Sequence, residues 1–147
     1  MQLTTFTDYA LRVLMYAHAA RGRRVTIEEM ASAYGISRAH LMKVVNSLTR
    51  TGYLKAVRGR SGGLLLAQPA ESIRLGDVVR ATEPNFALVE CFATGNQCVI
   101  TDCCRLPRLL NQALKAFLST LDQHTLASIA LRPKDVPGVL ADASSKS

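Results

Sequence analysis

The chain has 147 residues, of which 48% are hydrophobic and 20% are charged. This composition excludes a disordered or low-complexity chain, and the length suits a single domain. No apolar stretch reaches the ~18 residues of a membrane-spanning helix, and the N-terminus lacks the basic and apolar regions of a signal peptide. We therefore expect a cytoplasmic protein with no membrane partner.

The formal net charge of +7 comes from the first half of the chain. Residues 1–80 contain twelve Lys or Arg and five Asp or Glu, whereas residues 81–147 contain six of each. A basic half of this kind favours a polyanion as partner. Nucleic acid is favoured over a membrane because no basic amphipathic anchor accompanies the charge. The alternative is a basic surface that is merely solvated.

Two helices are predicted at the start of the chain. Apolar residues recur at helical spacing from Thr7 and predict a first helix that ends near Gly22. Thr26 and Glu29 have the spacing of a capping box, in which each side chain accepts a hydrogen bond from the other residue's amide. A short second helix should therefore run from this box to Tyr34.

A turn, a third helix and a hairpin follow. Gly35 suits a tight turn, and Ser37 can cap the third helix. This pattern is a weak signal alone, because many helical hairpins that bind nothing share it. Residues 53–57 and 64–67 strengthen it, since they have the pattern of two strands joined by the basic, glycine-rich loop 58–63. The sequence thus predicts a mainly α fold with a small β-hairpin, a winged helix-turn-helix.

Polar and basic residues occupy the start of the third helix and the loop of the hairpin. The leading turn of a recognition helix reaches base edges, so we expect Arg38 and His40 at bases and Lys43 at a phosphate. The arginines of the loop can pair with phosphates or enter a narrow minor groove. The expected DNA contacts are Ser37, Arg38, His40, Lys43, Arg58, Gly59 and Arg60. For each charged residue, plain solvation is the alternative.

All four cysteines lie between Cys91 and Cys104. In a reducing cytosol such a group favours metal ligands or sensors over disulfides, and the spacing lacks the paired C-x2-C knuckles of structural zinc. Three soft thiolates from one loop can hold an iron-sulfur cluster, with a fourth ligand from elsewhere. Adjacent side chains diverge, so we expect only one of Cys103 and Cys104 at the metal and the other as a small buried hydrophobe.

Other interpretations of the cysteines stay open. Cys103 and Cys104 can be the reactive pair of a direct thiol sensor, or the group can bind zinc. A cysteine-dependent enzyme needs a basic partner beside the thiol, and none of the three histidines is next to a cysteine in sequence. We therefore expect no enzymatic activity.

A regular apolar stripe follows the cysteines and predicts a long helix that ends near Asp122, with Pro107 in its first turn. The stripe consists of Leu106, Leu109, Leu110, Ala113, Leu114, Phe117, Leu118 and Leu121. So much apolar surface is unfavourable in water, and we expect a dimerisation helix that packs on a second copy of the chain. A homodimer also suits a palindromic double-stranded DNA operator. The alternative is a helix wholly covered by its own core.

These patterns divide the chain into four regions. The winged helix-turn-helix spans residues 1–83, the cysteine loop 84–104, and the dimerisation helix with the segment after it 105–131. Residues 132–147 contain two prolines and a serine-rich end. We expect this tail to be loosely ordered.

Several motifs together resemble a family of iron-sulfur winged-helix regulators that contains NsrR, IscR and RirA. The resemblance covers about residues 1–130. It is carried by LTTFTDYA at 3–10, VRGRSGG at 57–63, IRLGDVVR at 73–80, LVEC at 88–91 and CRL at 104–106. As a set, these motifs are most similar to the NsrR type, the nitric-oxide-sensitive repressors.

The resemblance implies a ligand set. In such proteins three cysteines hold a [2Fe-2S] or [4Fe-4S] cluster, and the matching positions are Cys91, Cys98 and Cys104, with Cys103 extra to the pattern. Some relatives add an aspartate from the opening helix, which implies Asp8 of the partner subunit as the fourth ligand. The alternative for Asp8 is structural, because an acid near a helix start caps it or stabilises it through the macrodipole.

Two sequence departures separate the relatives. IscR-type proteins use a histidine three residues after the last cysteine, where this chain has Pro107, so that ligand set cannot form. RirA-type proteins tend to have asparagine in place of Asp8, which favours nitric oxide over iron as the signal. The resemblance then implies a dimeric repressor that leaves DNA when nitric oxide attacks the iron. An iron-responsive regulator like RirA is the alternative.

Overall fold

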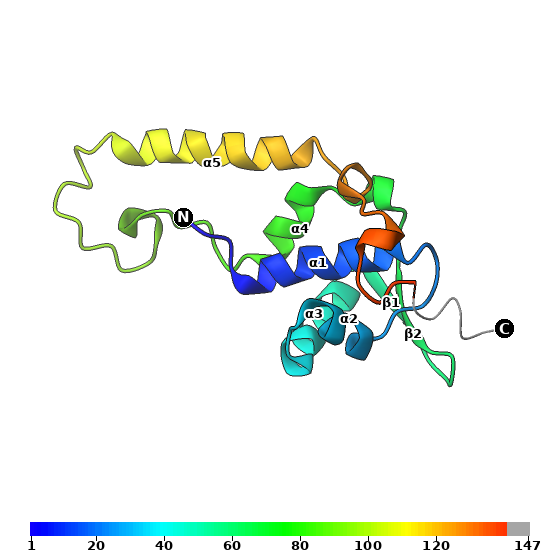
Figure 1. The fold of residues 1–147 in the computed structure, drawn as a ribbon. Helices are drawn as coiled ribbons and strands as arrows, with labels where there is room; N and C mark the ends of the chain where they lie inside the picture. The colour runs from blue at the N-terminus through cyan, green and yellow to red at the C-terminus, as the bar shows by residue number, and fades with distance from the viewer. Residues whose placement is uncertain (141–147) are drawn as a thin grey trace.

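The structure, a computed structural model, describes residues 1–140, which form five α-helices and one two-stranded antiparallel sheet (Figure 1). The helices are α1 (Thr5–Ala19), α2 (Ile27–Tyr34), α3 (Arg38–Arg50), α4 (Leu75–Thr82) and α5 (Leu106–Asp122). The strands are β1 (Leu54–Val57) and β2 (Gly63–Leu66), and short 3-10 turns include η3 (Leu126–Ile129) and η4 (Pro133–Asp135). The predicted mainly helical fold with a small hairpin is confirmed.

The helix-turn-helix begins and turns where the local sequence predicts. The Thr26 hydroxyl accepts from the Glu29 amide at 3.1 Å, and the Glu29 carboxylate accepts from the Thr26 amide at 3.1 Å. This completes the capping box of α2. Gly35 ends α2 with a φ of +64°, a left-handed conformation that favours glycine. The Ser37 hydroxyl then caps α3 by accepting from the His40 amide at 3.2 Å.

The hairpin is fixed to the body along one face. Leu54 lies opposite Leu66 in the register of β1 and β2, and the backbone of Val25 forms a further antiparallel bridge with Leu64. Leu64 and Leu66 point to the same face of the sheet, because alternate side chains of a strand do so, and Leu54 lies opposite Leu66. Leu54 and Leu64 are buried on this face. Only the loop between the strands projects from the body, at the lower right of Figure 1.

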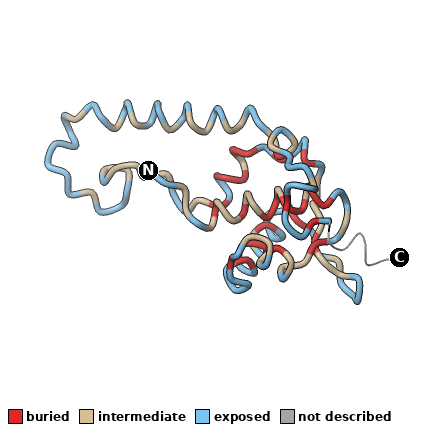
Figure 2. The backbone as a smooth tube through the Cα atoms, in the orientation of Figure 1, coloured by how far each residue is buried: buried red, intermediate tan, exposed pale blue. Residues whose placement is uncertain are grey.

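The core lies in the body formed by α1 to α4 and the sheet. Its largest fully buried side chains include Leu14, Tyr16, Met30, Leu41, Leu48, Leu54, Ile73 and Leu126. Figure 2 shows this burial concentrated in the body, whereas α5 and the cysteine loop are half-buried or exposed. The helix α5 therefore projects from a body that has its own core.

The segment after η3 corrects one expectation. A loosely ordered tail was predicted over residues 132–147, but Val136 and Val139 are only 5% and 3% exposed and belong to the core. The Arg23 guanidinium also donates to the Val139 carbonyl oxygen at 3.0 Å. Apolar burial thus fixes the first part of the tail, and residues 141–147 lie outside the described residues.

A partly buried polar cluster joins α1, α2 and this segment. The Tyr16 ring is fully buried, and its hydroxyl donates to Glu29 Oε1 at 3.1 Å. The same oxygen accepts from Arg23 at 2.8 Å. Burial, and after it the negative charge of Glu29, raises the pKa of Tyr16 to about 12. The neutral phenol is therefore the form that the fold stabilises.

Tyr16→Phe should lower the free energy of unfolding at pH 8 by about 1 kcal/mol, because a buried hydrogen bond is lost while Glu29 keeps its ion pair with Arg23. The folded pKa lies above the ordinary value of 10.0, so the phenol adds stability below pH 10 and loses it as the pH rises towards 12. Urea unfolding followed by circular dichroism should show the difference between wild type and variant shrinking from pH 9 to pH 11. Other alkaline titrations are common to both proteins, so a constant difference contradicts this assignment.

Candidate functional site

The DNA contacts predicted from the sequence lie on one side of the body. Figure 1 places α3 and the hairpin loop on its lower side, away from α5. The exposed residues of these two elements include Ser37, Arg38, His40, Lys43, Arg58, Gly59 and Arg60. The structure thus brings both predicted groups to one accessible surface, which we call the reading surface.

Contacts from α1 and α2 orient the start of α3. The His40 ring centroid lies 6.2 Å from that of Tyr9 in α1. Arg38 Nε donates to Glu28 Oε1 at 2.7 Å, and Glu28 lies in the first turn of α2. No local sequence pattern places Glu28 opposite Arg38, so the sequence alone does not indicate this contact.

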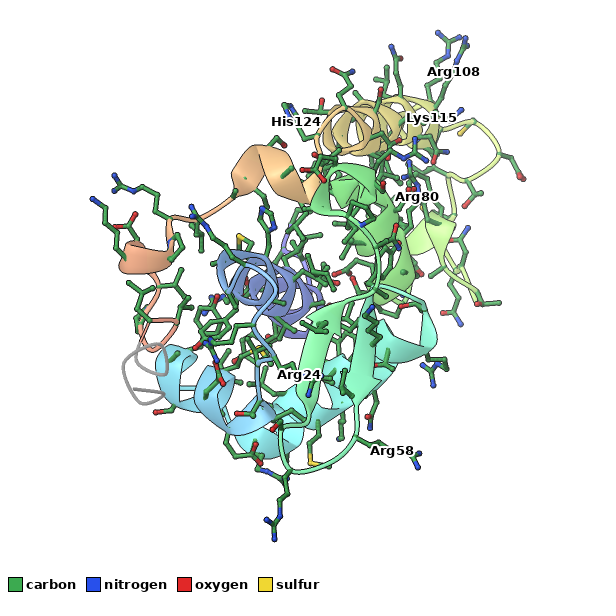
Figure 3. The ribbon with its side chains drawn as sticks, turned by 90° about the vertical axis from the view of Figure 1, so that its right-hand side faces the viewer. Arg24, Arg58, Arg80, Arg108, Lys115 and His124 are labelled. Atoms are coloured by element: carbon green, nitrogen blue, oxygen red, sulfur yellow. The ribbon has the colours of Figure 1, made fainter. Side chains whose placement is uncertain are left out.

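One basic residue outside the predicted set holds the hairpin loop. Arg24 Nη1 donates to the Ser61 carbonyl oxygen at 2.6 Å, across 37 positions of sequence. Arg58 points away from the body, as Figure 3 shows. The loop therefore presents its arginines from a backbone that is tied to the segment between α1 and α2.

The cysteine loop and the start of α5 border an open hollow of about 690 Å³. Cys91 and Cys104 both line it and are half-buried. Its other lining residues are Thr101, Pro107, Arg108, Asn111, Gln112 and Lys115. Two of the three predicted ligands thus share one hollow, and Arg108 and Lys115 of α5 (Figure 3) add positive charge to its wall.

The other two cysteines are exposed. Within residues 1–140, no set of three or more Cys, His, Asp or Glu side chains is placed to hold a metal ion, so Cys98 does not join the others here. The expectation of a small buried hydrophobe is wrong for Cys103, whose thiol donates to the Ile100 carbonyl oxygen at 3.4 Å. The amides of Cys103 and Cys104 both donate to that carbonyl, and this tight turn leaves only Cys104 against the hollow.

Local hydrogen bonds hold the loop around Cys98. The Gln97 amide donates to Glu90 Oε1 at 3.1 Å, within the loop itself. These bonds are exposed, and exposed bonds of this kind open at low free energy. Soft thiolate donors on one adaptable loop, beside two cations, fit an iron-sulfur cluster in their chemistry.

Asp8 is paired within its own helix and does not line the hollow. Its carboxylate accepts two hydrogen bonds from the Arg12 guanidinium, at 2.7 and 3.2 Å. The cap of α1 is Thr4, whose hydroxyl accepts from the Thr7 amide at 3.3 Å. Asp8 therefore does not cap α1, but it lies in the first turn of the helix, where the macrodipole part of the structural alternative holds, and its side chain is half-exposed.

The helix α5 leaves part of its apolar stripe uncovered. None of its residues is buried, and Leu106 and Leu109 are 51% and 62% exposed. Leu110, Leu114 and Phe117 line a second hollow, of about 710 Å³, shared with the N-terminal segment and the residues after α4. The alternative of a helix wholly covered by its own core is therefore wrong.

The C-terminal end of α5 is anchored to the body. Arg80 of α4 donates two hydrogen bonds to the Asp122 carboxylate, at 2.5 and 2.8 Å, and these bonds hold the pKa of Asp122 below its usual value. The Leu75 amide donates to the His124 carbonyl oxygen at 3.0 Å. A Cβ at Gly76 would collide with the Asp122 carboxylate, so only glycine leaves room for this anchor. One helix thus connects the anchor to the cysteine hollow.

A winged helix-turn-helix with an exposed, basic reading surface defines a DNA-binding transcription regulator. The chain belongs to the Rrf2 family, described as iron-dependent transcriptional regulators, which it matches over residues 3–132. Members of this family are transcription regulators, not enzymes; they bind DNA and are typically dimers. In the described part of the chain, no helix is both long and apolar enough to cross a membrane.

Solved structures of similar fold include three regulators. CymR, the global cysteine regulator of B. subtilis, is 25% identical, with a TM-score of 0.73 over 88% of this chain and 96% of that one. The oxidized form of Staphylococcus aureus CymR is 25% identical, with a TM-score of 0.70 over the same shares, 88% and 96%. IscR of T. potens is 22% identical, with a TM-score of 0.70 over 100% of this chain and 92% of that one, and shows likeness of fold alone.

Gly76→Ala should lower the free energy of unfolding by about 1–3 kcal/mol, because the added methyl group overpacks the anchor between Arg80 and Asp122. Urea unfolding measures the loss. In an Asp122→Ala background the obstacle is absent, so the same substitution should cost less than 0.5 kcal/mol or stabilise α4, by about the Gly-to-Ala difference in helix propensity. An equal loss in both backgrounds contradicts the assigned role of Gly76.

Proposed function

We propose that this protein is a homodimeric repressor whose affinity for a palindromic double-stranded operator is set by an iron-sulfur cluster that reacts with nitric oxide. The observation that carries the proposal is the placement of the cysteines. Cys91 and Cys104 share a hollow at one end of α5, and the other end of α5 is anchored to the DNA-reading body. A change at the hollow can therefore reach the DNA-reading body through α5 and its anchor on α4.

The reading surface would contact DNA in two places. Ser37, Arg38 and His40 belong to the leading turn of α3, which suits the major groove, and Lys43 suits a phosphate. Arg58, Gly59 and Arg60 form the tip of the wing and suit the backbone or the minor groove. The exposure of all seven residues supports this assignment.

The uncovered stripe of α5 supports a homodimer. Leu106 and Leu109 are largely exposed in one copy, and a second copy of the chain would cover them. A symmetric pair would also present two reading surfaces, as a palindrome requires.

The cluster would be held by Cys91, Cys98 and Cys104, as a [2Fe-2S] or [4Fe-4S] group. When bound, it supplies iron that nitric oxide can attack. The protein's own part is to close the loop: Cys98 moves to the hollow and ties the loop to α5. Arg108 and Lys115 reduce the repulsion between the gathered thiolates, since opposite charges nearby favour the ionised form.

Asp8 of the partner subunit is proposed as the fourth ligand. Within one copy, Asp8 is held only by the half-exposed Arg12, and such a pair adds little to stability. The carboxylate can therefore leave Arg12 for a stronger partner. A ligand from the second copy would make the separation of the two reading surfaces depend on the cluster.

A direct thiol sensor is the second candidate. Cys98 and Cys103 are exposed, free thiols, which is the state in which a cysteine can be oxidised. The family's description as iron-dependent also keeps iron, as in RirA-like regulators, as the alternative signal. Iron and sulfide content, and then the response to nitric oxide, separate these candidates.

Cys98→Ala should give a folded dimer with little iron or sulfide and at least tenfold weaker operator binding, since about 1.4 kcal/mol of lost preference suffices. The protein is purified anaerobically, and its absorbance spectrum, light scattering and DNA mobility shift are measured. The DNA is the duplex that wild-type protein selects from a randomised library. Wild-type affinity in the cluster-free variant refutes the switch.

Cys103→Ala is the matched control for that experiment. It removes an exposed thiol outside the hollow, so iron content and release from DNA by nitric oxide should stay as in wild type. Under a thiol-sensing mechanism, Cys103→Ala would instead lose its response to oxidants while a colourless wild-type protein kept binding DNA.

Arg60→Ala should weaken binding to all duplexes alike and reduce the slope of log affinity against log salt by about 1 for each wing. Fluorescence anisotropy over a salt series gives the slope. Lys134→Ala removes an equal charge from η4, outside the reading surface, and should leave the slope unchanged. An unaltered slope in Arg60→Ala removes this residue from the proposed DNA contact.

A further inference from the structure

Arg38 is held by an acidic residue of the neighbouring helix. Its Nε donates to Glu28 Oε1 at 2.7 Å, and its Nη1 lies 3.3 Å from the Met42 sulfur. The pair spans the turn, from the first turn of α2 to the first turn of α3. Arg38 lowers the pKa of Glu28 through this hydrogen bond, so the carboxylate is charged at neutral pH.

Stability does not explain this pair. The Glu28 and Arg38 side chains are 62% and 59% exposed, and exposed ion pairs contribute little to the free energy of folding. The capping box of α2 and the turn at Gly35 already set the relation of the two helices. A carboxylate on a surface that faces phosphates also weakens non-specific attraction.

The geometry leaves the reading edge of Arg38 available. A guanidinium has five N–H donors in a rigid fork, and Glu28 accepts at the Nε side. The Met42 sulfur is a weak acceptor, so the outer Nη1 and Nη2 edge keeps its donors for a stronger partner. Two parallel donors of this kind match O6 and N7 of guanine.

We propose that Glu28 is a specificity-determining positioning residue, which holds Arg38 so that its outer edge reads one guanine in each half-site. This rests on the proposed DNA contact of Arg38. Immobilising the long Arg38 side chain beforehand reduces the entropy lost on binding the correct base. The negative charge of Glu28 also lowers the affinity of the protein for all other DNA. Glu28 therefore acts on the ratio of specific to non-specific binding.

The test uses full-length protein, purified anaerobically at matched iron content. Wild-type protein first selects a palindromic duplex from a randomised library, and each base pair of that duplex is then replaced in turn. Glu28→Gln should lose about tenfold of the discrimination at one G·C pair per half-site and bind non-specific duplex more tightly. Discrimination at the other pairs should not change. Thermal unfolding confirms that the variant is folded.

Two further variants separate the possible failures. Glu71→Gln makes the same charge change outside the helix-turn-helix and should leave all discrimination intact. Arg38→Lys keeps the charge but removes the fork, so it should relax the same G·C pair, and adding Glu28→Gln should relax it no further.

The results for Glu28→Gln, Arg38→Lys and wild-type protein separate three conclusions. If Arg38→Lys loses discrimination and Glu28→Gln does not, the role of Glu28 is refuted while the DNA contact of Arg38 stands. If neither variant loses it, Arg38 does not read a base, and the positioning role of Glu28 falls with it. If wild-type protein selects no duplex, the proposed operator binding itself is overturned, and the inference with it.

Discussion

The attachment of α5 to α4, where Arg80 and Asp122 pair over Gly76, is the constraint on which the placement of the cysteine hollow depends. No residue of α5 is fully buried, and the helix is held to the body at its C-terminal end by its packing on α4, by this pair and by the backbone bonds beside it. A helix of 17 residues is about 25 Å long. A rotation of about 10° at the anchor therefore displaces the far end, at the cysteine hollow, by about 4 Å.

Positively charged side chains lie both on the reading surface and at the cysteine hollow, in different surroundings. On the reading surface the arginines are exposed, and one of them, Arg38, is held by an acid. At the hollow, Arg108 and Lys115 lie beside cysteines. The second half of the chain is neutral overall, so these two cations are a local arrangement and not part of a general basic surface. The position of each charged side chain therefore indicates the two sites better than the net charge of the chain does.

Local chemistry made much of the fold predictable. The capping box at Thr26, the turn at Gly35, the cap at Ser37 and the hairpin each depend on neighbours within a few positions, and all appear where the pattern predicts. The apolar stripe of α5 was equally clear, because a period of three and four is a property of sequence. The position of the reading surface could therefore be predicted from the sequence.

Contacts between distant segments could not be predicted in this way. Val139 packs into the core and accepts from Arg23 across 116 positions, and no local pattern indicates it. Glu28 and Arg38 are ten positions apart, but they meet only because a left-handed turn reverses the chain. The cysteines show both cases. Their number and spacing predicted a site but did not separate Cys103 from Cys104. The family resemblance favours Cys104, and a turn at the Ile100 carbonyl leaves Cys104 against the hollow.

A body with its own core suits the proposed switch better than one that unfolds. Burial is concentrated in α1 to α4 and the sheet, so each reading surface can keep its shape while α5 changes direction. Two recognition helices on a palindrome must match half-sites one or more helical turns apart. One base pair rises about 3.4 Å, and a shift of about 4 Å at the N-terminal end of α5 exceeds it. Under the proposed switch, a change of this size in the direction of α5 would put the second reading surface out of register with its half-site.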